Sequence, residues 1–322
     1  MRKIFKKMLA VTLAATTMLS LSACGSEGGS DTYKIGICQL VQHPALDAAT
    51  EGFKAALTEK LGDKVEFDVQ NAQGDTPTCA TIVNSFVSSN VDLILANATA
   101  PLQAASNATA DIPILGTSVT DYATALSMSD FTGKTGVNVS GTSDLAPLDK
   151  QAEMLHELFP EAENVGLLYC SAEPNSKFQV DKIKGYLEAY DITCTEYSFV
   201  DSNDIAAVVN GAVASSDVIY IPTDNTAASN TEVIDSIARA AGVPIIAGEE
   251  GICSGCGVAT LSIDYYDIGY KTGEMAYEIL VNKADIKNME IAYAPVVTKK
   301  YNTEIATELG IEIPEDYVAI GE

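Results

Sequence analysis

Short apolar segments alternate with amphipathic helical segments along most of this 322-residue chain. The apolar segments are rich in Val, Ile and Leu, which is typical of parallel strands that are buried on both faces. The helical segments between them are long enough to form the crossovers that parallel strands require. The sequence therefore predicts an α/β fold, with strands at 33–40, 65–70, 91–96, 112–115, 164–170, 192–199, 217–221, 244–247 and 258–263 and helices at 45–60, 77–89, 101–109, 147–158, 175–189, 203–214, 227–241 and 264–281.

The alternation is interrupted once, by the segment GVNVSGT at 136–142, and then restarts. Two runs of this size predict two doubly wound parallel-sheet domains. A helix at 264–281 and a strand at 291–298 follow the second run, which indicates that the chain returns to the first domain and then crosses again. We expect three hinge strands, near 141–145, 262–266 and 289–292. The expected domains are an N-terminal one of 33–142 plus 265–290 and a C-terminal one of 143–264 plus 291–322.

The first residues have the features of a bacterial lipoprotein signal. Basic residues at 2–7 precede an apolar stretch at 8–21, and Leu21-Ser22-Ala23-Cys24 then resembles a lipobox. The apolar stretch is shorter than the about 20 residues that a membrane-spanning helix needs. We expect a signal peptide at 1–23, a lipid on Cys24 and a flexible tether at 24–32, which would anchor the protein outside the cytoplasm. An ordinary signal peptide with an incidental cysteine is the alternative.

Charge and motif content argue against several classes of function. Removal of residues 1–23 takes away four positive charges and no negative one, which leaves a net charge of −29 on the mature body. Such an acidic body argues against nucleic acids and anionic lipid surfaces as partners. The chain has only two histidines and lacks a Gly-x-Ser-x-Gly motif, a Walker loop and a His/carboxylate cluster at metal-binding spacing. We therefore expect a protein that is not an enzyme, with neither cofactor nor metal.

Six cysteines remain besides Cys24. Four of them lie in apolar runs, where a free thiol behaves as a small buried hydrophobe. Cys253 and Cys256 form a CxxC that we expect in a loop, without the strand-loop-helix context of a redox motif. This pair is either a loop disulfide or two unpaired thiols.

Polar loops follow several expected strands at the point where a helix begins. They occupy 41–46, 97–103, 171–176 and 222–226, and two of them belong to each expected domain. Ligands of open α/β sheets bind at the carboxyl ends of the strands. If the two domains face each other, both sets of helix N-termini point into one cleft.

The residues around these loops resemble the tryptophan/tyrosine-type substrate-binding lipoproteins of ABC transporters, a branch of the type I periplasmic-binding-protein fold. The similarity covers nearly the whole mature body in order. Tyr122 departs from the pattern, because most members have proline after the aspartate. The matching passages are QLVQHPALDA (39–48), TSVTDYA (117–123), GVNVSGTSD (136–144), Asn175-Ser176, PTDNTA (222–227) and TLSIDYYDIGYKTG (260–273).

The resemblance implies that the ligand is an aromatic amino acid and that the partner is an ABC permease in the membrane. Such a ligand needs donors for its carboxylate, an acidic group for its ammonium and an apolar slot. The helix N-termini after Thr99 and Asn175 offer amide donors, and Thr117 and Ser118 add hydroxyl groups. Asp224 is the candidate for the ammonium. The remaining candidate ligand residues are His43, Tyr122, Ser176, Asn225 and Glu249.

Most of these residues also have a structural interpretation. Asp224, Thr99 and Asn175 could each cap a helix. His43 could lie in an exposed loop and Tyr122 could cover a domain edge. Glu249 could simply be solvated.

The sequence leaves three functions open. The first is a transport receptor that presents an aromatic amino acid to its permease. The second is a surface sensor or adhesin that uses the same closing fold. The third is a binder of another small molecule, such as a nucleoside or a sugar.

Overall fold

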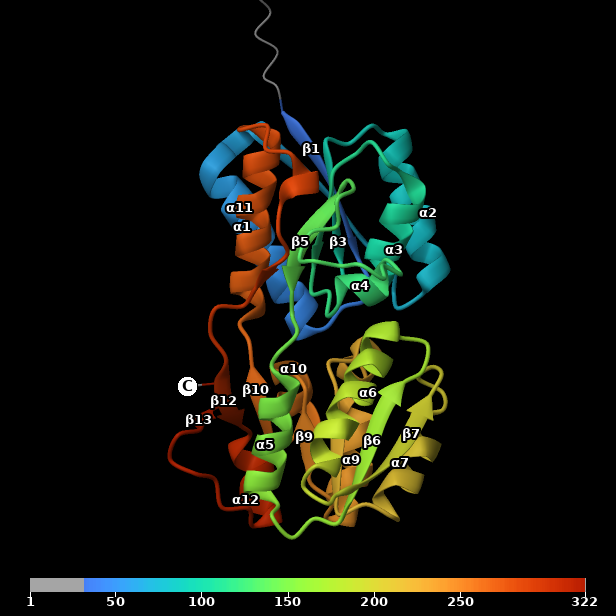
Figure 1. Ribbon diagram of the computed structural model, residues 1–322, viewed down its shortest axis with the longest axis vertical. Helices are drawn as coiled ribbons and strands as arrows, with labels where there is room; N and C mark the ends of the chain where they lie inside the picture. Colours follow the sequence, from blue (N-terminus) through green and yellow to red (C-terminus); the bar gives the residue numbers. More distant parts are fainter. Residues whose placement is uncertain (1–31, 322) are drawn as a thin grey trace, which may run out of the picture. The chain divides into compact units, whose positions relative to one another are not determined.

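The computed structural model describes residues 32–321, and these residues form two α/β domains (Figure 1). The expected signal peptide, the lipid on Cys24 and almost all of the tether lie outside the described residues. Within residues 32–321, no helix has both the length and the apolar character that crossing a membrane requires.

The first sheet contains six parallel strands in the order β11-β5-β4-β3-β1-β2. Side chains alternate across it, so Ile35 and Ile37 of β1 face one layer of helices and Cys38 faces the other. The first layer consists of α1 and α11, and the second of α2 and α3. The strands are β1 (Tyr33–Gln39), β2 (Val65–Asn71), β3 (Leu93–Asn97), β4 (Ile114–Thr117), β5 (Val139–Ser143) and β11 (Ala292–Tyr293), and the helices are α1 (Pro44–Leu61), α2 (Thr76–Ser88), α3 (Thr99–Ala108), α4 (Tyr122–Ala125) and α11 (Tyr265–Leu280), with 3₁₀ turns at Gly62–Lys64 and Ile286–Asn288.

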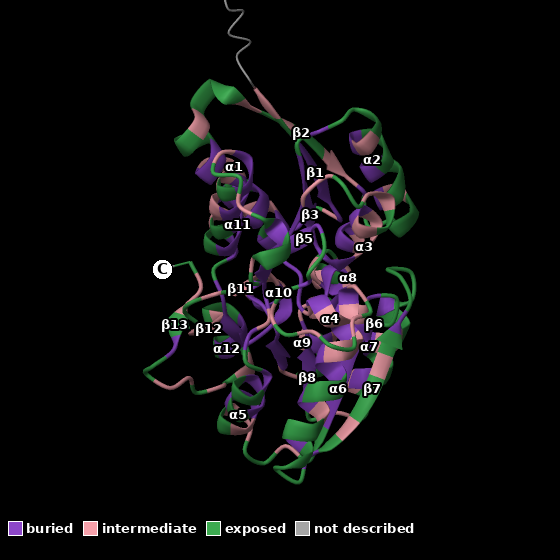
Figure 2. Ribbon diagram, turned by 45° about the horizontal axis from the view of Figure 1, so that its top comes forward, coloured by how far each residue is buried: buried purple, intermediate pink, exposed green. Residues whose placement is uncertain are grey.

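The second sheet contains seven strands in the order β13-β12-β10-β9-β8-β6-β7. One helical layer covers each face, α5, α6 and α12 on one side and α7, α9 and α10 on the other. Figure 2 shows buried residues concentrated in the central strands, whereas the edge strand β7 and the outer faces of the helices are largely exposed. The strands are β6 (Asn164–Cys170), β7 (Thr193–Phe199), β8 (Val218–Ile221), β9 (Ile245–Ala247), β10 (Ala259–Ser262), β12 (Thr298–Tyr301) and β13 (Val318–Ala319), and the helices are α5 (Leu148–Leu158), α6 (Pro174–Glu188), α7 (Ile205–Val213), α8 (Asn225–Ala228), α9 (Thr231–Ala241), α10 (Glu250–Cys256) and α12 (Thr303–Leu309).

The two-domain parallel-sheet fold expected from the alternation is confirmed, with three local corrections. The single strand expected at 291–298 is two strands, because β11 pairs in the first sheet and β12 in the second. Pro295 lies between them and has no N–H to donate to a ladder. The second sheet is not wholly parallel, since β12 runs antiparallel to β10. Cys253 and Cys256 lie in helix α10 as free buried thiols, where we expected a loop.

Helices α1 and α11 pack at backbone distance. A Cβ atom on Gly52 would lie 2.1 Å from the carbonyl oxygen of Tyr266, and one on Gly269 would lie 2.0 Å from that of Ala49. Only glycine, which has no Cβ, permits this approach at either position. The chain thus returns to the first domain as expected, and it does so as helix α11, which packs closely against α1.

Candidate functional site

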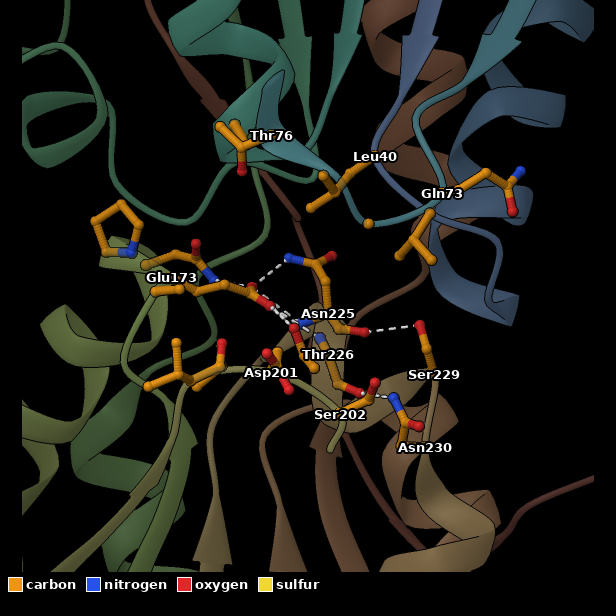
Figure 3. A pocket seen from close by; sticks show the side chains of 18 of the residues that line it. Leu40, Gln73, Thr76, Glu173, Asp201, Ser202, Asn225, Thr226, Ser229 and Asn230 are labelled. Atoms are coloured by element: carbon orange, nitrogen blue, oxygen red, sulfur yellow. Dashed lines mark hydrogen bonds between the residues drawn. The ribbon is translucent and has the colours of Figure 1, made fainter. Parts of the chain in front are cut away.

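The carboxyl ends of the strands of both sheets meet at a cavity of about 260 Å³ (Figure 3). Leu40, after β1, and Ala100, at the start of α3, line it from the first domain. Glu173, Asn175 and Asn225 line it from the second. This is the edge at which open α/β sheets bind ligands.

Glu173 is the most extensively bonded side chain of the cavity wall. It lies in the polar loop at 171–176, although it was not among the predicted ligand residues. Its carboxylate accepts from the backbone N–H groups of Asn225 (3.1 Å) and Thr226 (2.8 Å) at the start of α8. It also accepts from the Asn225 amide at 2.7 Å and from the Thr226 hydroxyl at 2.8 Å. Glu173 therefore fixes the first turn of α8, as the dashed lines in Figure 3 show.

His43 connects the two domains. It directly precedes α1 in the first domain, and its Nε2 lies 3.2 Å from Oδ1 of Asn225 in the second. The side chain is 7% exposed, and burial lowers the pKa of the imidazole. Its Nδ1 has no hydrogen-bond partner among the described residues. His43 is therefore a buried interdomain residue and not part of an exposed loop.

Thr99 and Ser118 lie where the backbone is strained. Ala98, just before Thr99, has φ 100° and ψ 169°, and Ser118 has φ 53°. The two loops are bonded to each other, because Ala98 donates its N–H to the carbonyl oxygen of Thr117 at 3.0 Å. Positive φ in residues other than glycine is costly and concentrates at ligand sites. The Ser118 hydroxyl is buried and has no partner among the described residues.

Two of the predicted ligand residues face the core of the first domain instead. Thr117 Oγ1 accepts from Thr142, whose hydroxyl also pairs with Thr272 of α11 at 2.8 Å. Tyr122 donates to the carbonyl oxygen of Thr142 at 3.1 Å, and its ring fills the space beside Gly116 that a Cβ would occupy. Neither Thr117 nor Tyr122 lines the cavity, and their roles as ligand contacts stay predictions.

Asn175 and Ser176 begin α6 beside the cavity and are buried. The Asn175 amide donates to Glu173 at 3.2 Å and to the carbonyl oxygen of Thr223 at 3.3 Å. Gln179, one turn later, donates to the same carbonyl oxygen at 3.0 Å. These amides hold the loops after β6 and β8 together, and Asn175 also faces the cavity.

Asp224 and Glu249 both cap helices of the second domain. Asp224 accepts from the N–H groups of Ala227 (2.8 Å) and Cys170 (2.7 Å), and Glu249 accepts from those of Gly251 and Ile252, both at 2.6 Å. Burial raises the pKa of each of these two carboxyls to about 7. The capping interpretation of Asp224 fits this geometry directly, and Glu249 is buried rather than solvated.

Asp144 is a further buried carboxylate, which follows β5 at the hinge. Its Oδ2 accepts from the hydroxyl of Tyr265 at 3.1 Å, and its Oδ1 has no partner among the described residues. Burial raises the pKa of this carboxyl to about 6. Sequence reasoning missed Asp144, although its position at the carboxyl end of a strand was a usable signal.

The buried charged groups of the interdomain region are all acidic. The buried carboxylate side chains of this region are those of Asp144, Glu173, Asp224 and Glu249. None of the Lys or Arg side chains that the structure describes is buried. A buried negative charge without a cation is costly, so the region favours a positively charged ligand group. No cluster of potential metal-binding side chains occurs among residues 32–321.

Comparison with known proteins identifies relatives over almost the full length. The sequence model of the family described as "ABC transporter substrate binding protein" matches residues 34–320. The "Tyrosine-binding protein" of Clostridioides difficile is 40% identical over 295 residues, which are 87% of this chain and 85% of that protein.

Two solved structures resemble the described fold to different degrees. The domain from Streptococcus pneumonia in complex with L-Trp is 34% identical and has a TM-score of 0.84, covering 88% of this chain and 96% of the other. The ligand-free, open structure of a substrate binding protein with adhesive properties from Clostridium difficile is 40% identical, yet its TM-score is 0.69, with 90% and 99% covered. The arrangement described above is thus nearer to that of the L-Trp complex than to the open form, despite the lower identity.

Proposed function

The chain belongs to the family of ABC transporter substrate-binding proteins, and on that premise we propose that it binds an aromatic amino acid between its two domains and delivers it to a membrane permease. The observation that carries the choice of ligand is the set of four buried carboxylates between the domains, with no buried Lys or Arg among the described residues, which complements an α-ammonium group. The relatives that bind tyrosine and L-Trp support the aromatic side chain.

We assign the ammonium to Asp144 rather than to Asp224. Asp144 keeps one buried oxygen without a partner, whereas both oxygens of Asp224 already accept backbone N–H groups. A hydrogen-bonded ion pair with the ligand would satisfy this oxygen.

The ligand carboxylate is assigned to the loops after β3 and β4. The N-terminus of α3 at Thr99 leaves N–H groups without intrahelical partners, and the Ser118 hydroxyl is an additional donor. The strained backbone at Ala98 and Ser118 supports a functional role for these loops.

A calorimetric screen tests the proposal. Tyrosine, tryptophan and phenylalanine are titrated against the mature protein, with leucine, uridine and glucose as controls. At least one aromatic amino acid should bind, and a hundredfold excess over Kd should stabilise the fold by about 2.7 kcal/mol. Binding of uridine or glucose without binding of any aromatic amino acid would refute the proposal.

Adhesion is the second candidate function, because a 40% identical relative is described as having adhesive properties. A surface role and a transport role use the same ligand cleft. Attachment of protein-coated beads to host cells, measured with and without tyrosine, tests the adhesive role. Attachment equal to that of albumin-coated beads would exclude it.

Location outside the cytoplasm and anchoring by a lipid on Cys24 complete the proposal. The lipobox and the membership in an importer family support it.

A further inference from the structure

We infer that Nδ1 of His43 accepts a hydrogen bond from an N–H or O–H group of the bound ligand, and that Glu173 and Asn225 of the opposite domain fix the tautomer of His43 that makes this possible. The inference rests on the proposed function and adds a determinant of ligand selectivity to it. The sequence suggested His43 either as a ligand residue or as an exposed loop residue, and it did not predict a hydrogen-bond acceptor at Nδ1.

The argument begins at Glu173, which fixes the orientation of Asn225. An ionised carboxylate only accepts hydrogen bonds, so the atom of Asn225 that lies 2.7 Å from Glu173 must be the amide nitrogen. The backbone N–H of Asn225 donates to the same carboxylate oxygen, Oε2, and holds the residue in place. The amide oxygen of Asn225 is therefore the atom that faces away from Glu173.

The orientation of Asn225 in turn fixes the tautomer of His43. Oδ1 of Asn225 is an acceptor and lies 3.2 Å from Nε2, so Nε2 must carry the proton. A neutral imidazole has one N–H, which leaves Nδ1 as a bare acceptor. Burial lowers the pKa of His43 and favours the neutral ring, although the carboxylates of Glu173 and Asp47 act in the opposite direction.

This acceptor is buried and unpaired within the described part of the protein. His43 is 7% exposed, and Nδ1 has no partner among residues 32–321. His43 itself does not line the interdomain cavity, but Val41, two residues earlier, and Asn225, its partner in the opposite domain, do. A ligand group with a proton to donate would satisfy Nδ1, and a ligand without one would leave it unpaired.

The chemistry requires a donor and admits two sources for it on an aromatic amino acid. One is the side chain, through the phenol hydroxyl of tyrosine or the indole N–H of tryptophan. The other is the α-ammonium group. A site built around a buried acceptor discriminates against an analogue that lacks the donor by roughly five- to 150-fold.

The test compares ligands on two variants by calorimetry. His43→Leu removes the acceptor, and His156→Leu makes the same change at the other histidine, which stacks on Tyr190 in the second domain. The ligands are L-tyrosine, L-phenylalanine, which lacks the side-chain donor, and 3-(4-hydroxyphenyl)propionate, which lacks the ammonium. The wild type and His156→Leu should bind L-tyrosine at least fivefold more tightly than one of these analogues. Because the ammonium also pairs with Asp144 in the proposed site, weak binding alone does not identify the donor, and the donor is the group whose absence matters less in His43→Leu than in the wild type.

In His43→Leu, the difference between L-tyrosine and one of the two analogues should shrink by at least about fivefold, while any part that comes from the ion pair with Asp144 remains. An equal loss for every ligand, with the difference preserved, would overturn the inference and leave the proposed function intact. A wild type that binds both analogues as tightly as tyrosine would overturn it as well. A wild type that binds no aromatic ligand would refute the proposed function and the inference with it.

Glu173→Gln tests the positioning step separately. A glutamine can donate as well as accept, so Asn225 is free to turn and the tautomer of His43 is no longer fixed. The variant should lose part of the same selectivity while His43 remains in place. Unchanged selectivity in Glu173→Gln would show that Glu173 does not fix the tautomer of His43.

Discussion

Replacement of Asp224 by asparagine separates the two interpretations of this carboxylate. In the structure, Oδ1 accepts from the N–H of Ala227 at 2.8 Å and Oδ2 accepts from that of Cys170 at 2.7 Å. Asparagine has one acceptor oxygen, so it can keep only one of these bonds. Its amide nitrogen would then face the other N–H, and one buried donor would lose its partner.

The loss of one buried hydrogen bond sets the magnitude. A buried donor without a partner costs about 1 to 3 kcal/mol, so the free energy of unfolding should fall by that amount. Ligand affinity should stay within about threefold of the wild type, which is less than 1 kcal/mol. Urea unfolding of the ligand-free protein measures the first quantity and calorimetry with tyrosine the second.

Asp264→Asn is the matched control. Asp264 also caps a helix, but it is exposed and accepts from a single N–H, that of Asp267 at 3.0 Å. Asparagine caps almost as well as aspartate, so its effect on unfolding should be under about 0.5 kcal/mol. If Asp224→Asn is as stable as the wild type and binds tyrosine thirtyfold more weakly, Asp224 holds the ligand ammonium and our assignment to Asp144 is wrong.

Three further predictions follow from the helix pair, the buried acids and the N-terminus. Gly52→Ala places a Cβ 2.1 Å from a carbonyl oxygen and should lower the melting temperature by several degrees. Gly185→Ala, at a helical position with open space around the Cβ, should leave the melting temperature unchanged or raise it slightly, and equal melting temperatures of the two variants would contradict the close packing. Burial raises the folded-state pKa of Asp144, Asp224 and Glu249 above the unfolded values of about 4, so the folded state takes up protons as the pH falls, and the ligand-free protein should become more stable from pH 8 to pH 5.5. Glu249→Gln should flatten this dependence, and a melting temperature that falls with acidification over this range would refute the prediction. Cys24→Ala should abolish the incorporation of radiolabelled palmitate and release the protein from membranes, and a labelled, membrane-bound variant would exclude Cys24 as the lipidation site.

The strands and most of the helices were predictable because hydrophobic period and length are local properties of the sequence. The strand expected at 164–170 is β6 to the residue, and β10 lies within the strand expected at 258–263. The position of Thr117 was predictable in principle as well. Strand residues alternate in direction, so Thr117 shares the face of Leu115, which packs toward α1 and α11.

The role of Glu173 could not be predicted in the same way. Its partners lie 52 and 53 residues later, and they meet it only because β6 and β8 are adjacent in the second sheet. The sequence shows polar residues after both strands but not which carboxylate meets which N–H group. The bond between His43 and Asn225 spans 182 residues and two domains, and it is equally invisible to local patterns.

The glycine contact between α1 and α11 determines how the first domain responds to rotation at the hinge. Helix α11 starts at Tyr265, directly after the hinge segment, and α1 starts at Pro44, directly after His43. With Gly52 and Gly269 against backbone atoms, no side chain lies between the two helices at these positions that could change rotamer and absorb a displacement. We therefore expect the pair to move as one rigid unit, so that a rotation at residues 263–264 would also displace His43. On the proposed function, opening the cleft to admit the ligand would then also break the contact between His43 and Asn225.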